Sequence, residues 1–341
     1  MKKTLNGMKK DRTFKNYAVS FLTMPITWQW KKSAFFTRIW ARGIIFIFSL
    51  VIISTSAYPI MDPNLSEDAR LGSLERYVKF QRLSVEIQSY AMKFSGKLGI
   101  VIKDLQTKQS IEINSSNLFP SASLVKLPIM AAYFQAERDG KIDLSGELTL
   151  KKRHKARPKT AIYRMRAGSK IGIKDLIEAM ITESDNTATN MLVEAIGFKY
   201  LNKGFAKFGL SKTDIRRGIM DLRKRNRGVE NFTTPKDMAF FLESIYRGEL
   251  VSSEASREML KILKRQKIND RIPVSFPESI VIAHKTGLLS NAVSDVGIVF
   301  TRKGDFIICI LTSEITSTRK AKKVIRRIAE YAYDLCYRSE I

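Results

Sequence analysis

Histidine and cysteine are scarce in this 341-residue sequence, and their scarcity excludes several kinds of chemistry. The two cysteines, Cys309 and Cys336, cannot form a disulfide framework and show no metal-binding spacing, so we expect two buried free thiols. With only His154 and His284, a histidine-based metal site and a Ser-His-Asp triad are both disfavoured. The sequence therefore predicts neither a metal nor an organic cofactor.

Internal repeats and low-complexity tracts are also lacking. Apolar residues make up 44% of the chain and charged residues 27%, which is typical of a folded globular protein rather than a disordered one. The length allows one large domain or two smaller ones, each with a hydrophobic core.

Acidic residues are few relative to basic ones, and the net charge is +26. A basic protein favours anionic surroundings such as lipid head groups, acidic polymers or nucleic acid. The densest basic cluster covers residues 151–159 and contains no aromatic residue, so we expect no specific nucleic-acid partner. The other cations are scattered, as on a solvated surface.

A full-length membrane-spanning run is lacking as well. Residues 43–57 form an uncharged, mostly apolar run of fifteen residues, whereas a spanning helix needs about 20. This run follows residues 1–42, which carry ten Lys or Arg and one acid, and it ends in a tolerable cleavage site at Thr55 and Ala57. We expect residues 1–42 to stay in the cytoplasm and the chain after residue 57 to be exported. A cleaved signal, an uncleaved membrane anchor, an internal start at Met24 and a buried core helix all remain open.

The order of elements after this segment predicts a two-part fold. Residues 58–75 form a polar linker, and residues 76–341 form the folded domain. Strands are expected at residues 97–105, 110–113, 279–283, 294–301 and 306–312. Helices are expected at residues 76–94, 173–181, 190–196, 235–246 and 319–337. The simplest assembly is an α+β fold, in which a five-stranded, mainly antiparallel sheet lies in an α/β/α sandwich and carries an inserted helical subdomain at about residues 128–275.

Three short motifs occur in order along the chain. They are Ser123-Leu124-Val125-Lys126, Ser184-Asp185-Asn186 and Lys285-Thr286-Gly287, and their first residues are separated by 61 and 101 positions. Each motif alone is common. Their joint order and spacing match the active-site triplet of serine β-lactamases and penicillin-binding proteins.

The first two motifs suit acyl transfer. Ser123 is expected to open a helix, so that backbone N–H groups surround its hydroxyl, and Lys126 lies one turn further on the same face. A neutral Lys126 can take the hydroxyl proton if burial and the cation Lys285 lower its pKa. Ser184 can relay a proton to the leaving nitrogen, while Asp185 is expected to hold its loop through bonds to the backbone.

Other groups of the motifs suit substrate binding. The candidates are Asn186, Thr286, Gly287 and the backbone N–H of Leu288. Asn186 can hold a substrate amide, and Lys285 with Thr286, at the end of a strand, can bind a substrate carboxylate. The N–H groups of Ser123 and Leu288 would form an oxyanion hole.

The likeness extends beyond these motifs. Four stretches resemble class A β-lactamases: FPSASLVKLPIM at 119–130, LIEAMITESDNTATNMLVEAIG at 176–197, ENFTTPKDMAFFL at 230–242 and IAHKTGLLSNAVSDVGIVF at 282–300. The resemblance covers roughly residues 76–341 and implies the two-part fold and a serine acyl-enzyme mechanism. Its substrate would be a β-lactam amide or the D-Ala-D-Ala peptide of the peptidoglycan stem. We expect a monomer.

One feature of that family is missing. Class A β-lactamases carry a glutamate in an ExxLN motif about seventeen residues before the proline of the TTP segment, where it activates the deacylating water. The equivalent position here is Gly218, and no ExxLN is present. Asp221 could be a displaced base, but pairing with a neighbouring Arg or capping a turn is favoured, and Glu230 lies farther along. This departure puts turnover of a β-lactam acyl-enzyme in doubt.

Three functions follow, in order of preference. The first is a β-lactamase-like active-site serine hydrolase. The second is a penicillin-binding D,D-peptidase or a slowly deacylating β-lactam sensor, although the intact motifs argue against a fold that has lost its activity. The third is a non-catalytic cell-surface protein that binds polyanions through its basic body, which salt-dependent binding would reveal.

Overall fold

The computed structural model describes residues 66–338. The basic region 1–42 and the expected export segment 43–57 lie outside the described residues. Among residues 66–338, none of the helices combines the length and the apolar character needed to cross a membrane. Cys309 and Cys336 are both free and buried, as expected.

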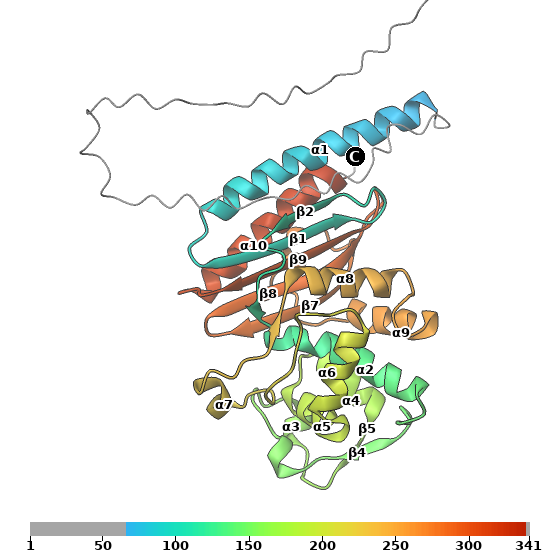
Figure 1. The fold of residues 1–341 in the computed structure, drawn as a ribbon, viewed down its shortest axis with the longest axis vertical. Helices are drawn as coiled ribbons and strands as arrows, with labels where there is room; N and C mark the ends of the chain where they lie inside the picture. The colour runs from blue at the N-terminus through green and yellow to red at the C-terminus, as the bar shows by residue number, and fades with distance from the viewer. Residues whose placement is uncertain (1–65, 339–341) are drawn as a thin grey trace, which may run out of the picture. The chain divides into compact units, whose positions relative to one another are not determined.

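A five-stranded antiparallel sheet forms the middle layer (Figure 1). Its strands, in spatial order, are β2 (Ser110–Ile113), β1 (Lys97–Asp104), β9 (Phe306–Ser313), β8 (Ala292–Phe300) and β7 (Val281–Leu289). In the register of the central strands, Cys309 of β9 lies opposite Val101 of β1 and Val296 of β8. Every residue of β9 is buried, because helices cover both faces of the sheet.

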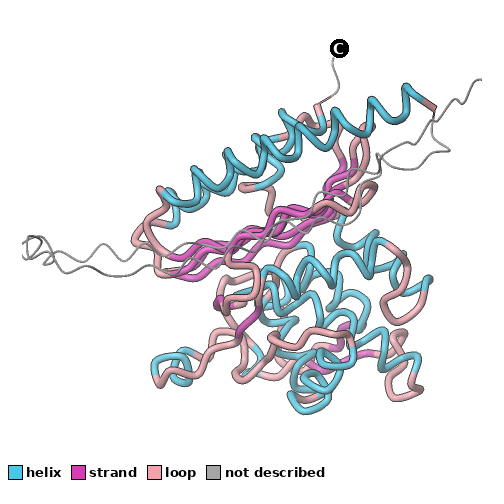
Figure 2. The backbone as a smooth tube through the Cα atoms, turned by 45° about the horizontal axis from the view of Figure 1, so that its top comes forward, coloured by secondary structure: helices cyan, strands magenta, loops and turns pink. Residues whose placement is uncertain are grey.

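Two helices cover one face of the sheet (Figure 2). They are α1 (Glu67–Met92) and α10 (Thr318–Ala332), and a short π-helical turn, Tyr333–Tyr337, continues α10. Phe80 and Leu83 of α1 join Ile325 and Ile328 of α10 in a core with the sheet. Residues 67–75, which were expected to form part of the linker, are instead the first turns of α1.

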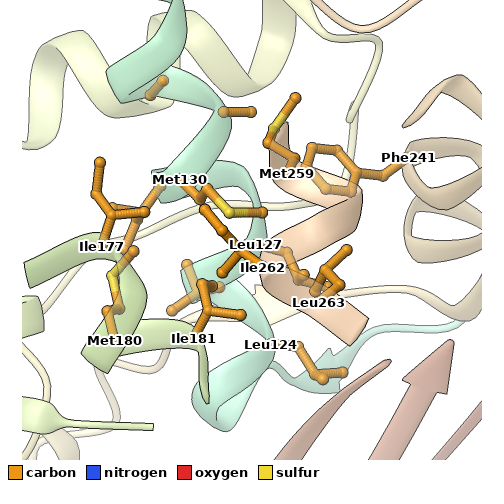
Figure 3. Packing of buried hydrophobic residues seen from close by; sticks show 14 of the residues in the cluster. Leu124, Leu127, Met130, Ile177, Met180, Ile181, Phe241, Met259, Ile262 and Leu263 are labelled. Atoms are coloured by element: carbon orange, nitrogen blue, oxygen red, sulfur yellow. The ribbon is translucent and has the colours of Figure 1, made fainter. Parts of the chain in front are cut away.

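The opposite face carries α8 (Pro235–Tyr246) and the helical part of the protein. The other helices of this part are α2 (Lys126–Arg138), α3 (Ala161–Arg164), α4 (Ile173–Thr182), α5 (Asn186–Ile196), α6 (Phe198–Lys207), α7 (Leu222–Asn226) and α9 (Ser253–Lys264). Two small two-stranded sheets pair β3 (Phe119–Pro120) with β6 (Phe232–Thr233) and β4 (Glu147–Thr149) with β5 (Lys170–Gly172). Figure 3 shows the shared core, where Met130 of α2 lies among Ile177 of α4 and Met259 of α9.

Local sequence signals explain where several helices begin. The Thr234 hydroxyl accepts a hydrogen bond from the N–H of Asp237, and Pro235 occupies the first turn of α8, as expected. The expected α+β fold with five strands is confirmed. Strand β7 is longer than expected, because it pairs with β8 along its whole length, so the Lys285-Thr286-Gly287 motif lies inside the strand and not at its end.

The close contact of β7 with β8 predicts the effect of one substitution. Gly297 of β8 lies opposite His284, and a Cβ added there would come within 2.6 Å of the His284 Cβ and 2.9 Å of the Ala283 carbonyl oxygen. We expect Gly297→Ala to lower the free energy of unfolding by about 1–3 kcal/mol, because neighbouring strands must move apart. Urea unfolding would measure the change.

A matched substitution controls for the removal of glycine. Gly72 in α1 has no atom within 4 Å of an added Cβ, so Gly72→Ala is expected to leave the protein as stable or make it more stable. Equal urea midpoints for the two variants would contradict the prediction.

Candidate active site

The nucleophile candidate lies where the sheet meets the helical part. Ser123 is half-buried in a 3₁₀ turn, Ala122–Val125, and α2 begins only at Lys126. The helix that was expected to open at Ser123 therefore starts one turn later. The residue before Ser123, Ala122, has φ +48, a left-handed conformation that is costly for residues with a side chain. Such strain is common where a reactive group must be exposed.

Lys126 connects the first motif to the second. Its Nζ is fully buried and donates to the Ser184 carbonyl oxygen (2.7 Å), the Ser184 Oγ (3.1 Å) and the Asn186 Oδ1 (2.8 Å). Burial lowers the pKa of Lys126 well below its usual range, and the charge of Lys285 lowers it further, while Asp185 opposes both. The site therefore favours the neutral amine that can accept a proton.

The second motif begins in the loop between α4 and α5, as expected, but its last residue, Asn186, is the first residue of α5. Ser184 has φ +56, and Asp185 caps α5 by accepting the N–H of Ala188 at 2.9 Å. This contact fits the structural role that the sequence predicted for Asp185. The Asn186 side chain accepts from Lys126 and donates to the Arg157 carbonyl oxygen at 2.6 Å, which leaves one amide hydrogen for another acceptor.

The third motif approaches the nucleophile from β7. A Cβ added at Gly287 would come within 3.3 Å of the Ala122 Cβ and 3.4 Å of the Ser121 carbonyl oxygen, so the absence of a side chain allows the close approach. Lys285 is fully buried, and its Nζ donates to the Thr286 carbonyl oxygen at 3.1 Å. Burial lowers the pKa of Lys285 to about 7, with Asp295 opposing the shift and Arg271 adding to it.

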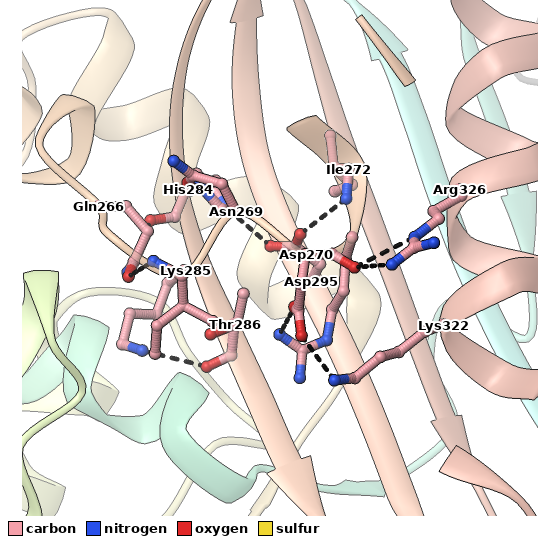
Figure 4. Close-up of polar contacts among 12 residues, drawn as sticks. Gln266, Asn269, Asp270, Ile272, His284, Lys285, Thr286, Asp295, Lys322 and Arg326 are labelled. Atoms are coloured by element: carbon pink, nitrogen blue, oxygen red, sulfur yellow. Dashed lines mark hydrogen bonds and ion pairs between the residues drawn. The ribbon is translucent and has the colours of Figure 1, made fainter. Parts of the chain in front are cut away.

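A buried polar network behind β7 was not predicted from the sequence (Figure 4). The His284 Nδ1 lies 2.9 Å from Asp295 Oδ1, and its Nε2 lies 3.0 Å from Asn269 Oδ1. The other Asp295 oxygen accepts the N–H of Ile272 at 3.1 Å. These contacts hold the residue next to Lys285 in place. One sequence signal could have indicated this network. His284 directly precedes the Lys285-Thr286-Gly287 motif, and Asp295 follows on the next strand of the same hairpin.

A cavity of about 410 Å³ opens beside Ser123. The first and second motifs contribute Ser123 and Asn186 to its lining, and Leu288 follows the third motif. Further lining comes from the segment after α6, including Ile219 and Met220. The cavity therefore joins the nucleophile, the end of β7 and this segment, whereas the buried Lys126, Lys285 and Thr286 do not line it.

The two candidate carboxylates, Asp221 and Glu230, are already engaged. Asp221 caps α7 by accepting the N–H of Lys224 at 3.1 Å and lines a separate hollow that it shares with Glu194. Glu230 accepts from Arg217 Nη2 (2.5 Å) and lies 3.2 Å from Arg225 Nε. None of the described residues that line the cavity beside Ser123 is acidic. The contacts of Asp221 therefore fit a helix cap better than a catalytic base.

A serine and two buried lysines at the junction of an antiparallel sheet and a helical region define the class of penicillin-recognising serine hydrolases. The chain belongs to the β-lactamase enzyme family, whose model matches residues 82–336. The predicted family and the serine-hydrolase class are thereby confirmed.

Individual relatives agree with this assignment. The β-lactamase VEB-1 of Pseudomonas aeruginosa is 23% identical over 272 residues, which cover 74% of this chain and 89% of VEB-1. The solved structure of PBP-A is 28% identical with a TM-score of 0.69, covering 74% of this chain and 95% of PBP-A. A leucine-to-glutamate variant of PBP-A, solved as an acyl-enzyme complex with penicillin G, has a TM-score of 0.68 at the same identity and covers 74% and 96% of the two chains.

The depressed lysine pKa values predict a bell-shaped pH profile for acylation. The rate constant should rise with pH as Lys126 loses its proton, and fall above a pH of about 7 as Lys285 loses the charge that attracts a substrate carboxylate. In Lys285→Arg the guanidinium stays charged, so the alkaline fall should move above about pH 9. Stopped-flow acylation by a fluorescent penicillin would measure both profiles. An alkaline limb that is the same in both proteins would contradict the assignment to Lys285.

Proposed function

We propose that the protein is a serine hydrolase that β-lactams acylate rapidly at Ser123 and that releases the acyl group slowly. One observation carries this proposal: Ser123 lines a cavity whose described lining offers no carboxylate, and Lys126, three residues further along, is fully buried. The family and the likeness to PBP-A support it, since a PBP-A variant is known as a penicillin acyl-enzyme.

Acylation uses the groups of the three motifs. The Ser123 Oγ attacks the β-lactam carbonyl carbon as its proton passes to the neutral Lys126 Nζ, and the backbone N–H groups of Ser123 and Leu288 stabilise the oxyanion. The amide C–N bond then breaks, and the Lys126 proton reaches the leaving nitrogen through Ser184, whose Oγ lies 3.1 Å from Nζ.

Substrate orientation falls to the remaining groups. The free amide hydrogen of Asn186 would hold the acyl-side carbonyl, and Lys285 with Thr286 would attract the substrate carboxylate. Thr286 directly follows Lys285 in the strand. Because the pKa of Lys285 is lowered to about 7, its side chain is mostly charged only below that pH.

Deacylation requires a base that can activate water on the ester. Glu230 accepts hydrogen bonds from Arg217 and from the N–H of Asn231 on Oε1, and its Oε2 lies 3.2 Å from Arg225 Nε, so the carboxylate is held in ion pairs and does not line the cavity. Asp221 is occupied in its cap and lies outside the cavity. Neither candidate carboxylate is therefore available to activate water, and the acyl-enzyme should persist.

Long-lived acylation suits a penicillin-binding peptidase or sensor as well as a slow β-lactamase. A D-Ala-D-Ala peptide offers the same carbonyl, leaving nitrogen and carboxylate, so the same residues can serve it. We propose that residues 43–57 deliver the domain across the membrane, where both substrates occur. The polyanion-binding alternative is weaker, because Lys151 and Arg153 of the basic cluster already pair with Glu194.

Rapid acylation with slow release predicts a covalent adduct. Incubation of the full-length chain with a fluorescent penicillin should give a one-to-one adduct at Ser123 that mass spectrometry still detects after a chromogenic cephalosporin shows little turnover. Ser123→Ala should give no adduct. Steady turnover with no accumulated adduct would refute slow deacylation, and absence of any adduct would refute acylation at Ser123.

A carboxylate placed in the cavity should accelerate release. Ile219 is partly buried and lines the cavity with Ser123, so Ile219→Glu would bring a base near the ester. We expect deacylation to become faster on the order of tenfold, below the full effect of an evolved general base. The decay of the penicillin adduct measures this rate.

The matched control is Ile219→Gln, which has the same shape but cannot accept a proton. If both variants release the acyl group at the same rate, the gain comes from loosening the segment and not from a base.

A further inference from the structure

Two arginines make the cavity beside Ser123 cationic. Arg217 and Arg225 both line it, and Glu230 is the acid that pairs with them. Two guanidinium groups and one carboxylate leave one net positive charge in this cluster. Because the charge lies in a partly enclosed cavity, water screens it less than it screens a surface charge.

The two arginines differ in how much hydrogen-bonding capacity they retain. Arg217 is 5% exposed, uses Nε and Nη2 on Glu230, and donates from Nη1 to the Gly218 carbonyl oxygen. Arg225 is 23% exposed and has a longer contact of 3.2 Å with Glu230 through Nε. Its Nη2 donates to Asn291 Oδ1 at 2.8 Å, and its Nη1 makes no hydrogen bond or ion pair within residues 66–338. Arg225 is thus the cation able to receive another anion.

The position of Arg225 sets which part of a substrate it could meet. Asn291 lies in the turn that follows β7, so the contact with Asn291 holds the guanidinium beside the end of that strand. Ser290 of the same turn also lines the cavity. The carboxylate-binding candidates Lys285 and Thr286 lie farther back in β7. An acyl side chain that fills the cavity would reach both the turn and Arg225, because Ser290 and Arg225 line it.

We propose that Arg225 binds a second carboxylate, carried on the acyl side chain of the substrate, and that the protein prefers dianionic acyl donors. The inference rests on the proposed acylation at Ser123 and adds a substrate class to it. Suitable donors are penicillins with an acidic side chain and stem peptides with a free carboxylate near the scissile amide. The guanidinium suits this role because it presents paired donors to a carboxylate.

Two penicillins isolate this contact. Carbenicillin differs from benzylpenicillin by one carboxylate on the side chain, so the ratio of their second-order acylation rate constants reports recognition of that group. In the full-length protein, Arg225→Gln should lower the carbenicillin-to-benzylpenicillin ratio by about fivefold or more, because a charge-assisted contact is lost. Added salt should lower the ratio in the wild type and have little effect on it in the variant.

A neighbouring arginine gives the matched control. Arg223 is an exposed residue of α7 that does not line the cavity, so Arg223→Gln removes the same charge and should leave the ratio unchanged. Arg225→Lys keeps the charge without the paired donors and should retain part of the preference. If Arg225→Gln fails to fold in a thermal melt, the lysine variant and the salt dependence of the wild type decide the matter.

The outcomes separate the two proposals. Equal slowing of both penicillins in Arg225→Gln would mean that Arg225 only tethers α7 to the β7–β8 turn, which overturns the anion site and leaves acylation intact. An equal fall of the ratio in Arg223→Gln would reduce the effect to overall charge and overturn it too. Failure of both penicillins to acylate the wild type would instead overturn the proposed function.

Discussion

The buried contact of Lys126 with the Ser184-Asp185-Asn186 turn is the interaction on which the site depends. Lys126 begins α2 directly after the nucleophile turn, and the Ser184-Asp185-Asn186 turn connects α4 to α5, so this contact fixes the nucleophile turn to the helical part. An amine without solvent is costly unless it is hydrogen-bonded, and the oxygens of Ser184 and Asn186 meet that need. The Asp185 cap and the left-handed Ser184 hold those oxygens in place.

A second buried lysine makes the first one reactive. Lys285 lies close enough for its charge to lower the pKa of Lys126, and its own pKa is lowered mainly by burial. Two amines that disfavour each other's charge reduce stability, and a rigid frame must hold them together. The His284–Asp295 contact and the close approach of Gly287 to the nucleophile turn provide that frame. The chemistry of the site therefore rests on residues that never touch a substrate.

The sequence predicted the parts of this arrangement that local patterns encode. The alternation and length of the strands, the Thr234 cap and the order of the three motifs were enough for the fold and for the residues around Ser123. The full length of β7 and the turn at Ser123 depend on contacts with distant residues. The pairing of Arg217 with Glu230 was equally inaccessible, because the two residues lie thirteen positions apart with the short helix α7 between them, and charge alone does not choose a partner among so many cations.

Both proposed properties of the site, slow release of the acyl group and preference for an anionic side chain, follow from one feature. The segment after α6 presents arginines to the cavity in place of a carboxylate. A carboxylate facing the acyl group would accept a proton from water, whereas a guanidinium cannot accept a proton and here holds Glu230 in an ion pair. Arg217 and Arg225 consequently remove Glu230 from the set of available bases and leave a net positive charge against the substrate. Slow release of the acyl group and preference for an anionic side chain are then two consequences of one cluster. When this segment supplies cations in place of a base, the acyl group stays on the serine and turnover is slow.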